Sequence, residues 1–269
     1  KKKIEDKSLA SLFKRKKVDV IINLAAQAGV RHSLKNPYVY IDSNVLGQVN
    51  MLELAKQLKV QKFIYASSSS VYGGNKEMPF SVKQRVDNPI SLYAATKKST
   101  ELIAECYSHL FKIQCVGLRF FTVYGPWGRP DMATFIFTKN ILENKAIQIF
   151  NYGKMKRDFT YIDDMVQWVL GWLKIKKKFC HKIYNLGNSH PEVLLEFIEV
   201  IEKNLNLKAK KTLLPIQPGD VSETYADISE SKKDFNFSPK TKVSTGILKF
   251  INWYKDYYKL WYSFLISFS

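Results

Sequence analysis

Cysteine is scarce in this sequence of 269 residues. The three cysteines, Cys106, Cys115 and Cys180, form no CxxC pair, and any one disulfide would leave an odd thiol. Disulfide frameworks belong to oxidising compartments, and metal sites need clustered ligands, so the pattern argues against both. We therefore expect a cytoplasmic protein without a bound metal.

Long hydrophobic runs are also missing. No stretch of 18 apolar residues occurs, and the opening KKKIEDKSLASLF has acidic residues where a signal peptide carries its apolar region. The chain closes on an apolar segment, residues 260–269, which is too short to span a bilayer and is expected to be an atypical docked or disordered tail. We expect a soluble protein with no membrane partner.

Acidic residues are outnumbered, with 24 Asp and Glu against 42 Lys and Arg, which gives a formal charge of +18. Such a surplus attracts polyanions, nucleotides or anionic membranes. The basic residues, however, form short clusters such as residues 14–17 and 208–211, and no nucleic-acid-binding motif accompanies them. Solvated lysine faces explain these clusters best, so no nucleic-acid partner is expected.

Apolar runs of strand length alternate with helical patterns along the first half of the chain. VDVIINLAA (residues 18–26), KFIYASS (62–68) and QCVGLRFFTVYG (114–125) read as buried strands, whereas residues 36–59 and 92–110 read as helices. This alternation predicts an α/β fold with a doubly wound parallel sheet and right-handed crossovers. The hydrophobic content of 46% is enough for a sizeable core.

The residue composition changes after Gly125, where turn-forming residues predominate. We expect a first domain of residues 1–125 with a return segment at 159–189, and a smaller α+β lobe of residues 126–158 and 190–259. The loop PIQPGDVSETYAD is of the kind that carries binding residues. The chain opens only a few residues before its first helical stretch and first strand, so we expect that one βαβ unit is missing ahead of it.

Tyr93-Ala-Ala-Thr-Lys97 is the pattern most suggestive of chemistry. A spacing of four places the phenol and the ammonium group on one helix face, where the cation can stabilise a phenolate that acts as a general base. Such pairs are common on helix surfaces, but serines 67–70 stand at the end of the preceding strand, where open α/β sheets bind ligands.

Five segments together resemble a known family. IYASSSSVYG, SLYAATKKSTE, LRFFTVYGPWGRPDMA, KRDFTYIDD and QPGDVSETYAD are similar to landmarks of the extended short-chain dehydrogenases/reductases, the NAD-dependent epimerases and dehydratases. Their wording resembles UDP-glucuronate 4-epimerases in particular, and the likeness runs in order from about Val18 to Tyr258. The resemblance implies a Rossmann-like fold, NAD as cofactor and a UDP-sugar as substrate.

Catalytic roles follow from the resemblance. Tyr93 would take the proton from the sugar 4-hydroxyl, and Lys97 would bind the nicotinamide ribose and lower the pKa of Tyr93. Ser68 would bind the reacting oxygen, and Ser69 and Ser70 would share this role or contact the sugar. Each serine could instead be a strand-end cap, because serine often satisfies local backbone groups.

The resemblance also places the NAD contacts. A turn after the first strand would approach the dinucleotide, Asn44 would hold that turn, and Phe121 would lie near the nicotinamide. Packing is an equally good explanation for the small turn residues, and a core position is the usual one for a strand phenylalanine. The turn consists of Leu24, Ala25, Ala26, Gln27 and Ala28.

Substrate contacts are expected in the later segments. The resemblance assigns Thr122 and Arg129 to the sugar, Arg157 to the diphosphate, and Gln217 and Asp220 to the uridine or ribose. A planar guanidinium suits phosphate, although both arginines could simply face water.

Three departures from the family pattern stand out. The glycine-rich turn that opens a Rossmann fold is absent, Lys3 falls roughly where relatives have an acidic residue, and Ser222 stands where proline is common.

The expected function is NAD-dependent 4-epimerisation of UDP-glucuronate to UDP-galacturonate through a 4-keto intermediate, by a homodimer that pairs helices near residues 45–59 and 92–110. UDP-glucose 4-epimerase is the nearest alternative. A 4,6-dehydratase is disfavoured because Ser69 and Ser70 replace its Asp-Glu pair. An inactive fragment or nucleotide-sugar binder is the alternative of another class.

Overall fold

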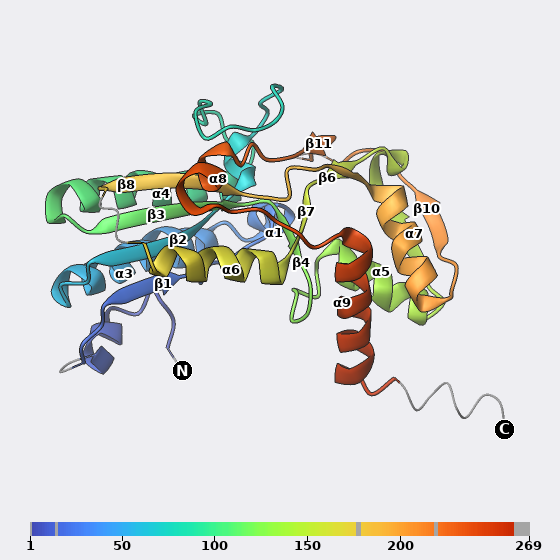
Figure 1. Cartoon of the computed structure of the whole chain (residues 1–269), viewed down its shortest axis with the longest axis horizontal. Helices are drawn as coiled ribbons and strands as arrows, with labels where there is room; N and C mark the ends of the chain where they lie inside the picture. Colours follow the sequence, from blue (N-terminus) through green and yellow to red (C-terminus); the bar gives the residue numbers. More distant parts are fainter. Residues whose placement is uncertain (1, 14–15, 176–178, 218–219, 261–269) are drawn as a thin grey trace. The chain divides into compact units, whose positions relative to one another are not determined.

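The computed structural model describes residues 2–13, 16–175, 179–217 and 220–260, so the predicted tail lies outside the described residues except for Leu260. The chain divides into two compact units (Figure 1). Unit 1 comprises Lys1–Phe121, Ile175–Leu186 and Asp227–Ser231, and unit 2 comprises Thr122–Lys174, Gly187–Ala226 and Lys232–Ser269. Their assignment to cofactor and substrate stays a prediction.

Unit 1 contains a parallel sheet in the order β1-β2-β3-β8. The centre of the sheet is dry, since Phe63, Ile64 and Tyr65 of β2 are at most 1% exposed. Apolar side chains on both faces are what a parallel strand between covering layers requires. The predicted α/β fold with a parallel sheet is therefore confirmed. The strands are β1 (Val20–Asn23), β2 (Lys62–Ser68), β3 (Gln114–Phe120) and β8 (His181–Leu186).

Helices of unit 1 follow the strands along the chain. Helices α3 and α4 pack on each other, and α4 also contacts β2, β3 and β8. The predicted helix at residues 36–59 is in fact a succession of α2, a π-helix and α3. The bounds are η1 (Lys7–Phe13), α1 (Val30–Lys35), α2 (Tyr38–Tyr40), the π-helix η2 (Ile41–Leu46), α3 (Gly47–Gln57), η3 (Ser69–Tyr72), α4 (Leu92–Phe111) and α8 (Ser229–Phe235), whose last residues belong to unit 2.

The predicted strand at residues 114–125 is two strands, β3 in unit 1 and β4 in unit 2. The chain changes partner at Phe121, whose N–H donates to the carbonyl of Leu186, whereas the next N–H, of Thr122, donates to the carbonyl of Asp158. Sequence alone could not reveal the break, because residues 118–124 contain no glycine, proline, asparagine or aspartate that would mark the end of a strand.

The described residues of unit 2 form three small sheets, with helices around an aromatic core. The sheets pair β4 with β7, β10 with β5, and β11-β6-β9. Phe159 stacks on Phe197 with ring centroids 3.8 Å apart, and Tyr124 meets both rings edge-on. The strands are β4 (Thr122–Tyr124), β5 (Ala146–Ile149), β6 (Lys156–Arg157), β7 (Phe159–Tyr161), β9 (Glu192–Val193), β10 (Lys210–Leu213) and β11 (Glu223–Thr224). The helices are α5 (Ala133–Leu142), η4 (Phe150–Gly153), α6 (Ile162–Leu173), α7 (Leu194–Leu205) and α9 (Val243–Tyr257).

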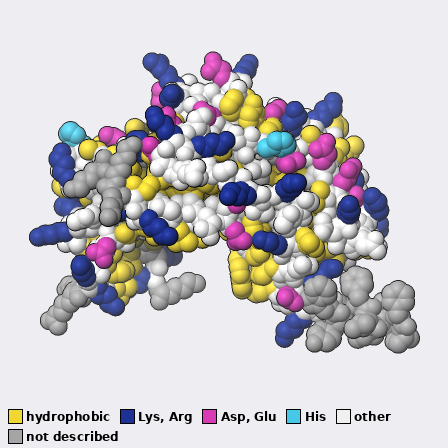
Figure 2. Space-filling view, viewed as in Figure 1, with side chains coloured by type: hydrophobic (Ala, Val, Ile, Leu, Met, Phe, Trp, Pro, Cys, Tyr) yellow, Lys and Arg dark blue, Asp and Glu magenta, His cyan; other side chains and the backbone are white. Residues whose placement is uncertain are grey.

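The surface of the described residues is basic, but its positive charge is not concentrated in one place. Lys and Arg side chains are spread across the face shown in Figure 2 and are not gathered into one patch there.

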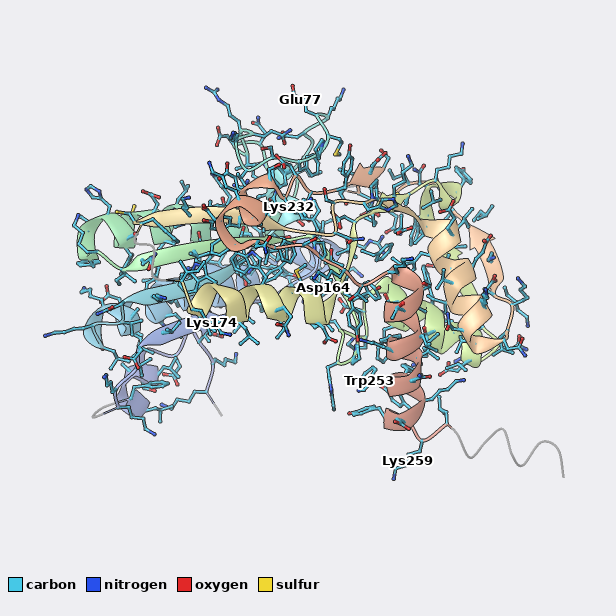
Figure 3. The ribbon with its side chains drawn as sticks, viewed as in Figure 1. Glu77, Asp164, Lys174, Lys232, Trp253 and Lys259 are labelled. Carbon is cyan, nitrogen blue, oxygen red and sulfur yellow. The ribbon has the colours of Figure 1, made fainter. Side chains whose placement is uncertain are left out.

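Helix α9 carries Trp253, which is labelled in Figure 3 and forms an aromatic cluster with Trp127 and Tyr257. Within the described part of the chain, no helix combines the length and apolar character needed to cross a membrane.

Candidate active site

Helix α4 carries the expected Tyr93 and Lys97 together with Glu101, at intervals of four residues that place all three on one face. Ser91 is the N-cap of the helix, because its hydroxyl accepts a hydrogen bond from the N–H of Ala94, at 3.1 Å. Tyr93 is half-buried, and its ring lies edge-on to that of Tyr40, with centroids 6.1 Å apart.

Lys97 is buried against the sheet, with its Nζ donating to the carbonyl of Ala66 in β2 at 2.8 Å. Burial disfavours the charged ammonium and lowers the pKa of Lys97 to about 8. A lysine that exchanges protons near neutral pH therefore stands one helical turn from Tyr93. Perturbed groups of this kind are typical of catalytic sites.

The serines at the end of β2 divide into two environments. Ser67 is buried and donates to Glu101 Oε1 at 2.7 Å, so its hydroxyl is committed to a structural contact. The Ser68 hydroxyl accepts from the N–H of Ser70 and donates to the Ser70 hydroxyl, each at 3.2 Å. Ser68 is thus a strand-end cap here, while Ser69 and Ser70 are half-buried in η3. The catalytic role of Ser68 stays a prediction.

The turn after β1 is held by Asn44 of the π-helix. Asn44 Oδ1 accepts from the N–H of Gln27 at 2.8 Å, and its amide nitrogen donates to the Gln27 carbonyl at 3.0 Å and to Thr96 Oγ1 at 2.9 Å. Leu24 and Ala25 are exposed, and Ala26, Gln27 and Ala28 are half-buried. The backbone of the turn is therefore both fixed and accessible.

A hollow of about 370 Å³ lies beside this turn. Small side chains on one wall allow a ligand to approach the backbone, which fits a dinucleotide. Phe121 is buried beside Tyr72 and Phe80, as expected of a core phenylalanine, so its contact with the nicotinamide stays a prediction. The lining includes Lys2, Lys3, Ile4, Glu5, Ala25, Ala26, Gln27, Val39, Asp42 and Ser43.

The residues expected to bind substrate are divided between the units: Ser69 and Ser70 lie in unit 1, and the others lie in unit 2. Thr122 is half-buried in β4. Arg129 is exposed and forms a two-pronged ion pair with Asp131, with Nε 2.9 Å from Oδ1. The guanidinium group lowers the pKa of Asp131. Arg129 is therefore exposed but paired with Asp131 in this structure, and its contact with the sugar stays a prediction.

Arg157 is half-buried in β6 and is tied to the neighbouring loop. Its Nη2 donates to the carbonyl of Val221 at 2.7 Å and its Nη1 to that of Ser222 at 3.2 Å. Burial lowers the pKa of Arg157, and the charge of Asp220 acts in the opposite direction. The backbone carbonyl of half-buried Gln217 accepts from the N–H of Asp220, so Arg157, Gln217 and Asp220 share one loop environment. Their contacts with a nucleotide stay predictions.

Asp158 is a residue that the sequence analysis missed. It is fully buried and accepts from the N–H groups of Asn188, Ser189 and Ala226 and from the Thr160 hydroxyl. Burial raises the pKa of Asp158, although these donors act in the opposite direction. Its backbone carbonyl also accepts from Thr122, so Asp158 organises the surroundings of Thr122 and Arg157. Only its place beside Arg157 in KRDFTYIDD could have drawn attention to it.

Comparison with known proteins defines the class to which this fold and site belong. The model of the NAD dependent epimerase/dehydratase family matches residues 3–187. The chain belongs to this family, and with that the expected resemblance, the NAD cofactor and the enzymatic character are confirmed.

Several individual proteins within reach of this comparison are similar to the chain over most of its length. An uncharacterized protein of Methanocaldococcus jannaschii is 56% identical over 92% of this chain and 76% of its own length. UDP-glucuronate 4-epimerase 2 of Arabidopsis thaliana is 46% identical over 93% of this chain and 62% of its own length. The crystal structure of a UDP-glucuronic acid 4-epimerase from Bacillus cereus, in complex with UDP-glucuronic acid and NAD, is similar with a TM-score of 0.89 and 36% identity, over 96% of this chain and 81% of that one.

Proposed function

We propose that the protein is an NAD-dependent 4-epimerase that interconverts UDP-glucuronate and UDP-galacturonate. The observation that carries this proposal is the Tyr93 and Lys97 pair on α4, with Lys97 buried and its pKa lowered to about 8. The similarity to UDP-glucuronate 4-epimerases of Arabidopsis thaliana and Bacillus cereus supports the choice of sugar.

Tyr93 acts as the general base in this proposal. Its phenol oxygen takes the proton of the sugar 4-hydroxyl, and the Lys97 cation favours the phenolate form that this step requires. NAD held at the turn after β1 would supply a hydride acceptor for C4, from which the hydride would return to the other face of the ketone. Ser68 steadies the reacting oxygen, and Tyr93 gives the proton back, so that the sugar is neither oxidised nor reduced overall.

A uronic acid poses a further problem, because its 4-keto form is a β-keto acid that can lose CO₂. The site must therefore hold the carboxylate away from the geometry that favours this loss. Arg129 suits that task if its two nitrogens exchange the exposed Asp131 carboxylate for that of the substrate, which offers the same pair of oxygens. Thr122 and the half-buried Ser69 and Ser70 supply further hydroxyls for the sugar.

The two enzymatic alternatives differ in what they require of the site. A UDP-glucose 4-epimerase needs no group for a carboxylate, so the accessible Arg129 favours the uronate. A 4,6-dehydratase needs an acid and a base to eliminate water, and Ser69 and Ser70 ionise too weakly for this near neutral pH. A nucleotide-sugar binder without turnover is the remaining alternative.

The experiment is to incubate the full-length protein separately with UDP-glucuronate, UDP-glucose and UDP, and to resolve the products by chromatography. We expect UDP-galacturonate from UDP-glucuronate and little conversion of UDP-glucose. Turnover of UDP-glucose alone, a pentose product with CO₂, or binding without turnover would each overturn the proposal.

We also propose a homodimer. Helix α4 leaves Leu102 and Leu110 exposed, at 57% and 65%, beside the half-exposed Phe111. Apolar side chains repeated along one helix can pack on the same helix of a second copy around a two-fold axis.

A further inference from the structure

The segment before α3 contains an unusual helix. Residues Ile41–Leu46 form a single stretch of π-helix between α2 and α3. π-helical turns are rare and are frequently found at functional sites. Tyr40 immediately precedes this stretch and Asn44 lies within it, and both direct their side chains to the turn after β1.

Tyr40 binds the backbone of that turn at two consecutive residues. Its hydroxyl lies 2.9 Å from the carbonyl oxygen of Ala28 and 2.6 Å from that of Gly29. A phenol has a single hydrogen, so the two carbonyls share one donor. With the contacts of Asn44 to Gln27, residues 27, 28 and 29 are all held by side chains from one short segment.

The same segment contacts the helix that carries the catalytic pair. The Tyr40 ring meets the Tyr93 ring at an interplanar angle of 77°, with centroids 6.1 Å apart, and Asn44 donates to Thr96, the residue before Lys97. The Tyr40 side chain is completely buried, so water does not compete with it for these contacts from its own side. The turn and the Tyr93 phenol are therefore attached to one common support.

We infer that Tyr40 is a positioning residue, which fixes the turn that receives the dinucleotide and orients Tyr93 at the same time. We call the hydrogen bonds of the Tyr40 hydroxyl to the carbonyls of Ala28 and Gly29 the clamp. The inference rests on the proposed function for the identity of the ligand, but the clamp itself is a property of the fold. Tyr40 contacts neither substrate nor reacting atoms in this account. It acts through the carbonyls of Ala28 and Gly29 and through the Tyr93 ring.

A simpler explanation is that Tyr40 fills the core, where its ring also lies 5.9 Å from that of His32. The two explanations differ in the hydroxyl group. A core aromatic residue tolerates replacement of tyrosine by phenylalanine, because the ring contacts remain. A clamp does not, because the half-buried carbonyl of Ala28 loses the Tyr40 hydroxyl and that of Gly29 keeps only the N–H of Ser33, at 3.3 Å.

The experiment compares Tyr40→Phe with wild type in the full-length protein, with Tyr38→Phe as the matched control. Tyr38 lies two residues earlier and is 79% exposed. Amide hydrogen exchange of residues 26–30 is read by mass spectrometry, and NAD⁺ affinity is read by calorimetry. We expect about tenfold faster exchange in this turn and about five- to tenfold weaker NAD⁺ binding in Tyr40→Phe, both from the loss of one hydrogen-bond donor. Exchange in β2 and β3 should be unchanged, and Tyr38→Phe should match wild type.

Unchanged exchange at residues 26–30 would overturn the inference, as would faster exchange spread equally over the whole sheet, which would indicate a general packing role. The exchange measurement needs neither bound cofactor nor turnover. A protein that shows the clamp but converts no UDP-sugar would therefore contradict the proposed function alone, whereas normal conversion with an unaffected turn in Tyr40→Phe would contradict this inference alone.

Discussion

Arg119 and Glu101 form a buried two-pronged ion pair, with Nε 2.8 Å from Oε1 and Nη2 2.9 Å from Oε2. The pair connects β3 to α4, and Ser67 adds β2 through its own hydrogen bond to Glu101. The guanidinium carbon of Arg119 also lies 4.9 Å from the centre of the Tyr72 ring. Glu101 follows Tyr93 and Lys97 on the same helix face, so this contact fixes α4 against the two strands that lead into the site.

We therefore predict that Glu101→Gln lowers the free energy of unfolding by about 3–5 kcal/mol, because it leaves the Arg119 charge buried without its partner. Denaturant unfolding monitored by circular dichroism measures this. Glu196→Gln, at an exposed position on α7, is the control and should change stability by less than about 0.5 kcal/mol. A loss below about 1 kcal/mol in Glu101→Gln would show that the pair does not support the fold.

The second prediction concerns Lys97 and the pH dependence of the free energy of unfolding. Its pKa in the folded chain is about 8, below the ordinary value of 10.5, so between these two pH values the unfolded chain binds more protons than the folded one. Stability must then rise with pH across this window, and the penalty for burying the charge is fully present below pH 8. The rise should be absent from Lys97→Met, and the difference between the two proteins isolates the contribution of Lys97 from that of other groups. Urea unfolding at several pH values tests this, and equal slopes in wild type and variant would contradict the burial of a titrating Lys97.

The third prediction concerns Tyr93. Tyr93→Phe in the full-length protein should lower kcat by about 10²- to 10⁴-fold, because the general base is removed, while affinity for the nucleotide-sugar stays nearly the same. Ser68→Ala should cost less if Ser69 can take over its hydrogen bond. Steady-state kinetics and calorimetry with UDP-glucuronate separate the two effects. An unchanged kcat in Tyr93→Phe would mean that another group abstracts the proton.

Asp158 provides a fourth prediction. Asp158→Ala removes the acceptor of three backbone N–H groups and one hydroxyl, all in a buried site, and each unsatisfied donor costs about 1–3 kcal/mol. Unit 2 should lose several kcal/mol of stability by this estimate. Asp163→Ala on α6, at an exposed carboxylate, is the matched control. Equal melting temperatures for the two variants would contradict the central place of Asp158.

The proposed dimer is tested by placing charge on the exposed face of α4. Leu102→Glu should convert a dimer to a monomer in sedimentation equilibrium, since a buried charge without a partner is costly at an interface. Leu248→Glu, on α9 and 46% exposed, should leave the assembly unchanged. A wild-type monomer, or a dimer that survives Leu102→Glu, would exclude this face.

The sequence predicted the parallel sheet well because its strands are covered on both faces, so that VDVIINLAA and KFIYASS are rich in apolar residues. It could not predict where one strand ends and the next begins at Phe121, because tertiary hydrogen bonds to Leu186 and Asp158 decide this. Nor could it distinguish the π-helix around Asn44 from an ordinary helix, since six residues span too few turns to define a period.

The residues of the candidate site also fall into those that the sequence could identify and those that it could not. Tyr93 and Lys97 could be identified because a local spacing of four carries the chemistry. Asp158 and Tyr40 could not, because their importance lies in partners 30 or 68 residues away for Asp158 and 11 or 12 residues away for Tyr40. The environment of the serines also depends on Glu101, which is remote in sequence from Ser67.

The most direct test of the account follows the hydrogen at C4. The full-length protein is incubated with UDP-glucuronate that carries deuterium at C4, and the product is examined by mass spectrometry and proton NMR. The account predicts UDP-galacturonate that retains the deuterium at C4, because the hydride is removed and returned within one site and never exchanges with water. Product with the deuterium replaced by hydrogen from solvent, or no UDP-galacturonate at all, would contradict it.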